Sequence, residues 1–205
     1  MSLVVIETGI ANVGSVINMC RRLGNDPVVS DDPGVIAIAE KLILPGVGTF
    51  DASMANLHKS GLTEALQLRA SEGVPLLGIC LGMQLLFDSS EEGLVTGLGL
   101  IPGVVKRLSV DSPTGPVRIP HMGWSRLVQP QPHDLTKGIS EEARFYFVHS
   151  YAVVPKEDSD IIGISTHGTT FVSAVARENV LGVQFHPEKS HRYGKALLGN
   201  FLQEF

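Results

Sequence analysis

The sequence predicts a single α/β domain with a mostly parallel central sheet, and three observations lead to this prediction. Apolar, strand-like runs alternate with amphipathic, helix-like runs through the first half of the 205 residues. Such alternation is typical of a parallel sheet flanked by helices on both faces. The second half contains short strand-like runs separated by Gly, Pro, Asn and Asp, which predicts antiparallel strands added to the same sheet. No internal repeat or linker divides residues 1–205, so we expect one domain.

The first half supplies the parallel part of the sheet. Its expected strands are short apolar runs, at Leu3–Ile6, Pro27–Ser30, Lys41–Leu44 and Pro75–Ile79. Its expected helices are amphipathic runs, at Gly14–Leu23, Ser53–Lys59, Leu62–Ser71 and Leu81–Phe87. Glycines at positions 24, 61 and 73 stand where helix C-termini favour a residue that tolerates the left-handed conformation.

The second half is expected to add antiparallel strands and a closing helix. The strands are predicted at Val104–Leu108, Val117–Ile119, Trp124–Val128, Arg144–Val154, Ile161–Thr166, Phe171–Arg177 and Leu181–Phe185. The helix is predicted over Tyr193–Phe205, because apolar residues between Leu197 and Leu202 recur on one helical face.

Charge and composition narrow the class of partner. The net charge is −5 and the basic residues form no cluster beyond Arg21 and Arg22, so we expect no nucleic-acid partner. The sequence has no run of roughly 18 uncharged apolar residues, the length that a membrane helix needs. The N-terminal run lacks the basic segment of a signal peptide, and two cysteines suggest no disulfide framework. We therefore expect a cytoplasmic protein without membrane contact.

The most informative motif is Gly78–Gly82, with the sequence Gly-Ile-Cys-Leu-Gly, which joins an apolar strand to a helix. A nucleophile elbow has this form, and its glycines let a strained turn approach neighbouring chains closely. A helix N-terminus at Cys80 favours the reactive thiolate through the helix dipole and free N–H groups. Taken alone, the motif fits equally well a buried cysteine in an ordinary strand-to-helix turn.

A histidine and a glutamate near the other end of the chain supply the groups that such a nucleophile needs. His186 and Glu188 stand two residues apart after an apolar run, and such positions face the same side of an extended segment. We expect Glu188 to orient and charge His186, and His186 to deprotonate Cys80, as in a catalytic triad. The alternative is a solvated strand end with an incidental charge pair.

A glycine-rich loop is the expected third part of the site. Gly46, Val47 and Gly48 follow the strand predicted at Lys41–Leu44, and such a loop can direct N–H donors at a developing oxyanion. The N–H of Leu81, directly after the nucleophile, is the expected second donor. By itself this loop is a turn signal. All three motifs follow predicted strands, and ligands of open α/β sheets bind beyond the carboxyl ends of strands, so we expect one shared site.

Taken together, these motifs resemble those of the class I (triad) glutamine amidotransferases, and they occur in that family's order. Three further blocks, at Thr8–Val16, Pro120–Trp124 and Phe145–Tyr151, are similar to the family of glutaminase subunits of imidazole glycerol phosphate synthase. The resemblance extends over essentially the whole chain.

The resemblance implies a reaction and its substrate contacts. It implies hydrolysis of L-glutamine to glutamate and ammonia by Cys80, His186 and Glu188, with neither a metal nor an organic cofactor. The further residues that it implies around the glutamine are Gln84, Glu92, His149, Ser150 and Tyr151. The residues alone leave open that Gln84 merely packs in the core and that Glu92 lies in a solvated loop.

The resemblance also implies a partner, because free ammonia would be protonated in water and lost by diffusion. The implied partner is a separate (β/α)8-barrel cyclase subunit, which uses the ammonia to make imidazole glycerol phosphate and AICAR. The residues that match positions facing this partner are Asn12, Trp124, Tyr146 and Lys189. Core packing is the ordinary alternative for the single tryptophan.

Two other functions stay open at this point. A free-standing cysteine hydrolase, or a glutaminase that serves another synthase, would need the same triad. A non-catalytic binding module fits poorly with a complete set of Cys80, His186 and Glu188. Of the other histidines, we expect those at positions 58, 133, 167 and 191 to be exposed, and we expect His121 to shape a loop.

Overall fold

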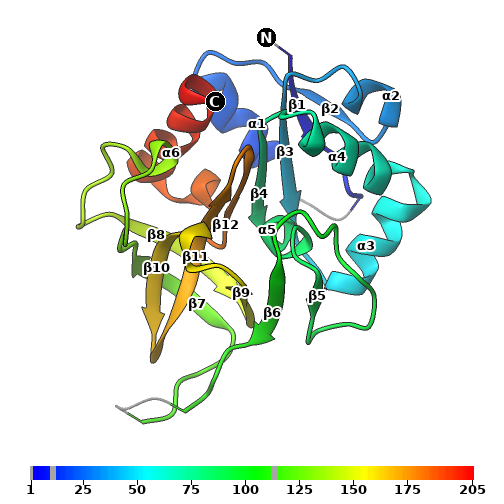
Figure 1. Ribbon diagram of the computed structural model, residues 1–205. Helices are drawn as coiled ribbons and strands as arrows, with labels where there is room; N and C mark the ends of the chain where they lie inside the picture. The colour runs from blue at the N-terminus through cyan, green and yellow to red at the C-terminus, as the bar shows by residue number, and fades with distance from the viewer. Residues whose placement is uncertain (1, 10–12, 112–114) are drawn as a thin grey trace.

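The computed structural model describes residues 2–9, 13–111 and 115–205 and has the predicted α/β arrangement (Figure 1). The strands are β1 (Leu3–Ile6), β2 (Val28–Ser30), β3 (Lys41–Gly46), β4 (Leu76–Cys80), β5 (Ser89–Ser90), β6 (Gly103–Arg107), β7 (His121–Arg126), β8 (Arg144–His149), β9 (Tyr151–Pro155), β10 (Ile161–His167), β11 (Thr169–Arg177) and β12 (Val180–Val183). The helices are α1 (Val13–Arg22), α2 (Pro33–Ile36), α3 (Phe50–Lys59), α4 (Leu62–Ser71), α5 (Leu81–Leu85) and α6 (His191–Glu204). Short 3-10 helices are η1 (Asp134–Thr136), η2 (Asp158–Asp160) and η3 (Pro187–Lys189).

The large sheet has the order β2-β1-β3-β4-β12-β11-β9-β6-β5, with β10 paired to β11. The five strands from β2 to β12 are mutually parallel. The strands β9, β10 and β11 join by antiparallel pairing, as the sequence predicts for the second half. Parallel strands bring their carboxyl ends to one edge, where Gly46 of β3 and Cys80 of β4 are register partners.

Side chains alternate across the parallel strands and so build two cores. Leu3 and Val5 of β1 face the core that includes α1 and α6. Val4 and Ile6 face the core that includes α2, α3 and α4. Helices therefore cover both faces of these strands (Figure 1). Burial on both faces explains why the strands read as continuous apolar runs.

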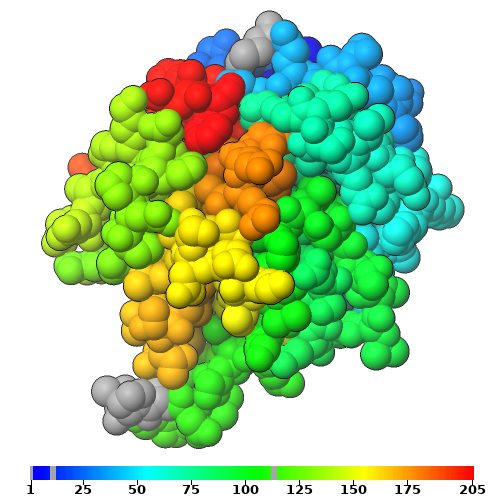
Figure 2. Space-filling view, viewed as in Figure 1, coloured from blue at the N-terminus to red at the C-terminus, as the bar shows by residue number. Residues whose placement is uncertain are grey.

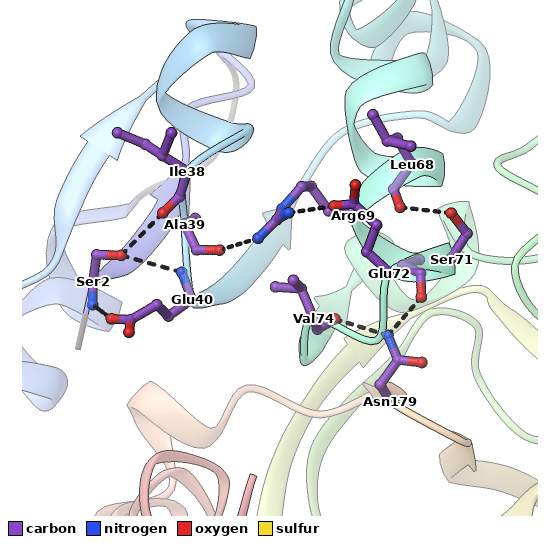
Figure 3. A network of polar contacts seen from close by, with 11 residues as sticks. Ser2, Ile38, Ala39, Glu40, Leu68, Arg69, Ser71, Glu72, Val74 and Asn179 are labelled. Atoms are coloured by element: carbon purple, nitrogen blue, oxygen red, sulfur yellow. Dashed lines mark hydrogen bonds and ion pairs between the residues drawn. The ribbon is translucent and has the colours of Figure 1, made fainter.

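Figure 3 shows a network of polar contacts that lies where the chain enters β3, β4 and β12. The side-chain amide of Asn179 donates to the carbonyl oxygens of Ala70 and Val74, at 2.9 and 2.8 Å. The guanidinium of Arg69 donates to the carbonyl oxygen of Ala39 at 2.6 Å. Asn179 lies in the turn between β11 and β12, which Figure 2 shows in orange against the blue-green α4 region. These contacts tie β12 to the chain that enters β4, and so help to hold the two strands in register.

The strands β7 and β8 form a separate antiparallel ribbon beside β10, to which a bridge between Val128 and Ile164 connects it. The single strand predicted over Arg144–Val154 is therefore wrong, because it is two strands. The chain passes at Ser150 from the ribbon into the large sheet, where the Ser150 carbonyl accepts from the N–H of Leu108 at 2.9 Å. The ribbon thus ends at the edge of the predicted site.

The remaining differences from the predicted elements are local. Val117–Ile119 is not a strand, because the prolines that flank it cannot donate to a ladder. The expectation of a loop at His121 is also wrong, since this residue begins β7 and is 3% exposed. Helix α2 and strand β5 were not predicted, since two to four residues give too little periodicity. Among the described helices, none has both the length and the apolar character needed to cross a membrane.

Candidate active site

The nucleophile candidate stands in a strained turn. Buried strand β4 ends at Cys80 and helix α5 begins at Leu81. Cys80 has φ 56° and ψ −112°, a backbone conformation rare for a residue with a side chain. A Cβ on Gly78 would lie 2.7 Å from the carbonyl oxygen of Gly82, and a Cβ on Gly82 would overlap the carbonyl of Leu44. The predicted strand-turn-helix geometry is confirmed, and its glycines are required for close approach.

His186 and Glu188 form a buried pair beside this turn. The Nδ1 of His186 lies 2.8 Å from Oε1 of Glu188, and both side chains are about 5% exposed. The expected geometric reason for the pair is wrong, because β12 ends at Val183 and Glu188 lies in η3. A tight turn, rather than an extended segment, brings the two side chains together. Its position is set by the His186 N–H, which donates to the Tyr146 carbonyl of the ribbon at 2.9 Å.

The surroundings of His186 favour its protonated form. Burial by itself lowers its pKa, but Cys80 in its thiolate form and the Glu188 carboxylate raise the pKa to about 10. Among the described residues, Nε2 of His186 and Oε2 of Glu188 have no hydrogen-bond partner. The ring is therefore held by Nδ1, and Nε2 is free for a proton transfer.

A cavity of about 290 Å³ opens at this edge of the sheet and brings most of the predicted residues together. The predicted residues that line it are Val47, Gly48, Cys80, Leu81, Gln84, Glu92, His149, Ser150, Tyr151 and His186. Pro120 and Val148 line it without having been predicted as site residues. Glu188 does not line the cavity, since it lies behind His186.

The glycine-rich loop contributes to the cavity in two different ways. Val47 and Gly48 line it, and Gly48 has φ +98°, which favours glycine. Gly46 instead belongs to β3, two residues beyond the predicted end of that strand. A Cβ on Gly46 would lie 2.6 Å from the nitrogen of Gly82. Gly46 therefore allows β3 to pack on the elbow, and it lines a smaller hollow on the far side of His186.

Gln84 and Glu92 both reach the cavity and both have internal partners. Gln84 is 4% exposed, and its Nε2 donates to the carbonyl of Tyr151 at 3.1 Å and to Oε1 of Gln184 at 2.9 Å. A carboxylate oxygen of Glu92 accepts from the N–H of Phe50 at 2.9 Å, at the beginning of α3. Glu92 is thus a fixed negative charge at the cavity wall, held by a helix N-terminus.

The opposite wall of the cavity carries a neutral histidine network that sequence reasoning missed. Nδ1 of His149 donates to the Tyr151 carbonyl at 2.8 Å, because a carbonyl can only accept. Its Nε2 therefore accepts, and Nδ1 of His121 is the donor at 3.0 Å. The His121 ring stacks on His167, with the ring centres 4.2 Å apart. Burial lowers the pKa of His149 to about 3 and that of His121 to about 4.

Three of the four predicted partner-facing residues gather at one surface beside the ribbon. Trp124 is 46% exposed and stacks flat on His191, with the ring centres 5.4 Å apart. Tyr146 packs edge-on against Trp124, and the Lys189 ammonium lies 5.9 Å from the Tyr146 ring centre. The fourth residue, Asn12, lies outside the described residues. Core packing of the tryptophan is thus excluded by its exposure.

Solved structures with the same fold belong to the glutamine amidotransferases. PurLQS from Thermotoga maritima superposes with a TM-score of 0.75 at 18% identity, over 99% of this chain and 98% of that chain. A glutamine amidotransferase from the same organism gives a TM-score of 0.71 at 12% identity, over 100% and 97% of the two chains. At these identities the likeness defines the fold alone.

The family model for glutamine amidotransferase class-I matches residues 4–205, so the chain belongs to the class I glutamine amidotransferase family. The curated proteins to which this chain is similar include subunits of one particular enzyme. The imidazole glycerol phosphate synthase subunit HisH of Moorella thermoacetica is 50% identical over 198 residues, which are 96% of this chain and 92% of that protein. The subunit of the same name from a Synechocystis strain is 45% identical over 202 residues, which are 98% and 95% of the two chains.

Proposed function

We propose that this chain is the glutaminase subunit of imidazole glycerol phosphate synthase and acts in histidine biosynthesis as one domain over residues 1–205. Near-full-length similarity to the HisH subunits supports this assignment. The observation that carries the chemistry is the strained Cys80 beside His186, whose free Nε2 is aligned by Glu188 through Nδ1.

The first half of the proposed reaction transfers the acyl group of glutamine to the enzyme. The proton of the Cys80 thiol passes to Nε2 of His186, whose surroundings favour the protonated ring, and the resulting Cys80 thiolate attacks the side-chain amide carbon of L-glutamine. The charge on the amide oxygen is met by N–H groups of Leu81 and of the Val47–Gly48 loop. His186 then gives its proton to the departing nitrogen, the C–N bond breaks, and ammonia and a thioester result. Glu188 stabilises the imidazolium throughout.

The second half releases glutamate. His186 deprotonates a water molecule, which attacks the thioester carbonyl at the same oxyanion position. The C–S bond breaks and Cys80 recovers its proton from His186. For the rest of the substrate, we assign the ammonium group to Glu92 and the carboxylate group to the backbone from His149 to Tyr151. All of these groups line the same cavity.

The ammonia is proposed to pass to a separate (β/α)8-barrel cyclase subunit in a heterodimer. The exposed Trp124 and the neighbouring Tyr146 and Lys189 are the proposed contact surface for this partner. This surface adjoins His186, because Tyr146 and His186 form a β-bridge. We place the complex in the cytoplasm, since the mechanism requires Cys80 as a free thiol and reducing compartments preserve thiols.

Ammonia release from glutamine tests the proposal. The full chain is assayed alone and with a purified cyclase subunit that carries its nucleotide ligand. We expect little activity alone and a large rise with the loaded partner. In Cys80→Ser, both rates are expected to fall by about 10³-fold or more.

The outcomes separate the parts of the proposal. High activity alone that the partner does not change would indicate a free-standing glutaminase. Silence under both conditions would overturn the assignment to this synthase. Ammonia release by Cys80→Ser at the unmodified rate would overturn the nucleophile.

A further inference from the structure

A buried amide side chain touches the sulfur of the candidate nucleophile. Gln184 is the first residue after β12 and is 0% exposed. Its Nε2 lies 3.8 Å from Sγ of Cys80, within reach of an N–H to sulfur hydrogen bond. Its own backbone N–H is fixed by the carbonyl of Ser173 at 2.9 Å. The segment that follows β12 therefore contributes two side chains to the site, this amide and, two residues later, His186.

The direction of the Gln184 amide is set by a chain of hydrogen bonds that begins at a backbone carbonyl. The Tyr151 oxygen can only accept, so Gln84 must turn its NH₂ group toward it. The second N–H of Gln84 then points to Gln184, which must present Oε1 to receive it at 2.9 Å. The NH₂ group of Gln184 is consequently left facing Cys80. Reversal of either amide would oppose two donors or two acceptors in a buried place, which is costly.

Besides His186, the sulfur thus has one neighbour suited to its thiol form and one suited to its thiolate form. The Val148 carbonyl, 3.9 Å from Sγ, can accept the S–H of the thiol. The N–H of Gln184 can donate to the thiolate but gains little from the thiol, because sulfur in S–H is a weak acceptor. A donor that bonds the charged form favours that form. When the proton leaves Sγ for Nε2 of His186, the negative charge on sulfur remains beside the Gln184 amide.

We propose that Gln184 stabilises the Cys80 thiolate through its side-chain N–H, and that Gln84 and the Tyr151 carbonyl orient it for this task. The inference deepens the proposed function, on which it rests, since it takes Cys80 as the nucleophile. It also gives Gln84 a role beyond lining the substrate cavity.

The pH dependence of Cys80 alkylation by iodoacetamide tests the inference without requiring glutaminase activity. The full chain is treated between pH 5 and 10, and the modified Cys80 peptide is quantified by mass spectrometry. The charged or titratable groups around the sulfur are His186 and Glu188 beside η3, His149 on β8 and Glu92 on the cavity wall. All of them are unchanged in the variants below.

The main variant is Gln184→Met, which keeps a long side chain but has no N–H. We expect the midpoint of the alkylation profile to rise by about one pH unit, the size of one charge-assisted hydrogen bond, and the rate at neutral pH to fall about tenfold. In the glutaminase assay, kcat is expected to fall about tenfold with little change in KM. The matched control is Gln67→Met, whose amide donates to a distant carbonyl, that of Leu98. An unchanged midpoint in folded Gln184→Met would overturn the inference.

A second variant tests the orienting chain and serves if Gln184→Met does not fold. Gln84→Met keeps a long side chain and adds no charge, but it removes the N–H that holds Oε1 of Gln184. Nothing in the chain from Tyr151 then keeps the NH₂ group of Gln184 directed at the sulfur. We expect the alkylation midpoint to rise here too, although position 84 has no hydrogen bond to Sγ. An unchanged midpoint in Gln84→Met would overturn the orienting role, whereas retained ammonia release in Cys80→Ser would instead overturn the proposed function.

Discussion

The two walls of the candidate cavity hold buried histidines whose pKa values are shifted in opposite directions. His186 is 4% exposed and His149 is 6% exposed, so burial disfavours the imidazolium at both. At His186, Cys80 in its thiolate form and the Glu188 carboxylate together outweigh burial and raise the pKa to about 10. At His149, burial dominates over the bond to the Tyr151 carbonyl, and His121 opposes a second charge, so the pKa falls to about 3.

The difference shows that the partners of a histidine, rather than its depth, decide what it can do. A group that shuttles protons needs an acidic neighbour that tolerates its charged form. A ring that stays neutral over the working pH range keeps one donor and one acceptor in place. His149 can therefore hold the Tyr151 carbonyl while His186 changes its proton. The same cavity combines the wall of Cys80 and His186, to which we assign the proposed chemistry, with a wall of fixed shape.

Among the substitutions that test this difference between His186 and His149, the largest effect is expected when the charge beside His186 is removed. Glu188→Gln keeps the shape of the side chain but leaves Cys80 as the only named group that opposes the effect of burial on the ring. We expect the His186 pKa to fall, and ammonia release to fall by about 10²- to 10⁴-fold. NMR titration of His186 and the rate of glutamine hydrolysis measure the two effects. Glu142→Gln, at an exposed pair with Arg126, is the control.

The same substitution makes a prediction about stability. Because the folded pKa of His186 is raised from 6.5 to about 10, this ring stabilises the native state fully below pH 6.5. That contribution is lost as the pH rises toward 10. The melting temperature of Glu188→Gln should therefore lie below that of the unmodified chain at pH 6.5, and the difference should be smaller near pH 10. A difference that grows with pH would contradict the raised pKa of His186.

The wall of Cys80 and His186 was the part of the site that the sequence could predict. The elbow around Cys80 is a local motif, and its glycines report directly on the close packing that a Cβ would block. The pairing of His186 with Glu188 was also found, but through an argument about an extended strand that the turn at η3 replaces. Resemblance supplied Gln84 and Glu92, which spacing alone does not mark.

The neutral wall could not be predicted, because its contacts join segments that are distant in sequence. His121 and His149 meet through the pairing of β7 with β8, a ribbon whose register depends on tertiary packing. Gln184 gave no signal of its own, since a glutamine beside an apolar strand normally faces solvent. In the fold, likewise, the parallel strands could be predicted, because burial on both faces gives them continuous apolar sequences. The split at Ser150 required knowing where one sheet ends and another begins.

A smaller effect is expected when the neutral wall is altered. His121→Phe preserves ring stacking but removes the N–H that Nε2 of His149 accepts. A buried acceptor without a donor costs about 1–3 kcal/mol of unfolding free energy. We expect a lower melting temperature and a KM for glutamine raised a few-fold, with kcat changed by less than about tenfold. His133→Phe, away from the cavity, is the control for KM, and a loss of kcat as large as that of Glu188→Gln would break the comparison.

The smallest effect is expected at the other cysteine, which is the thiol counterpart of His149. Cys20 lies on α1 at 0% exposure, and burial raises its pKa to about 11, so it stays neutral and unreactive. Cys20→Ala should leave ammonia release unchanged within about twofold and reduce the unfolding free energy by about 1 kcal/mol. Iodoacetamide at pH 8 should label the native chain once, at Cys80, and the variant to the same extent. Labelling of native Cys20, or a dependence of ammonia release on this residue, would show that burial alone does not make a thiol unreactive in this fold.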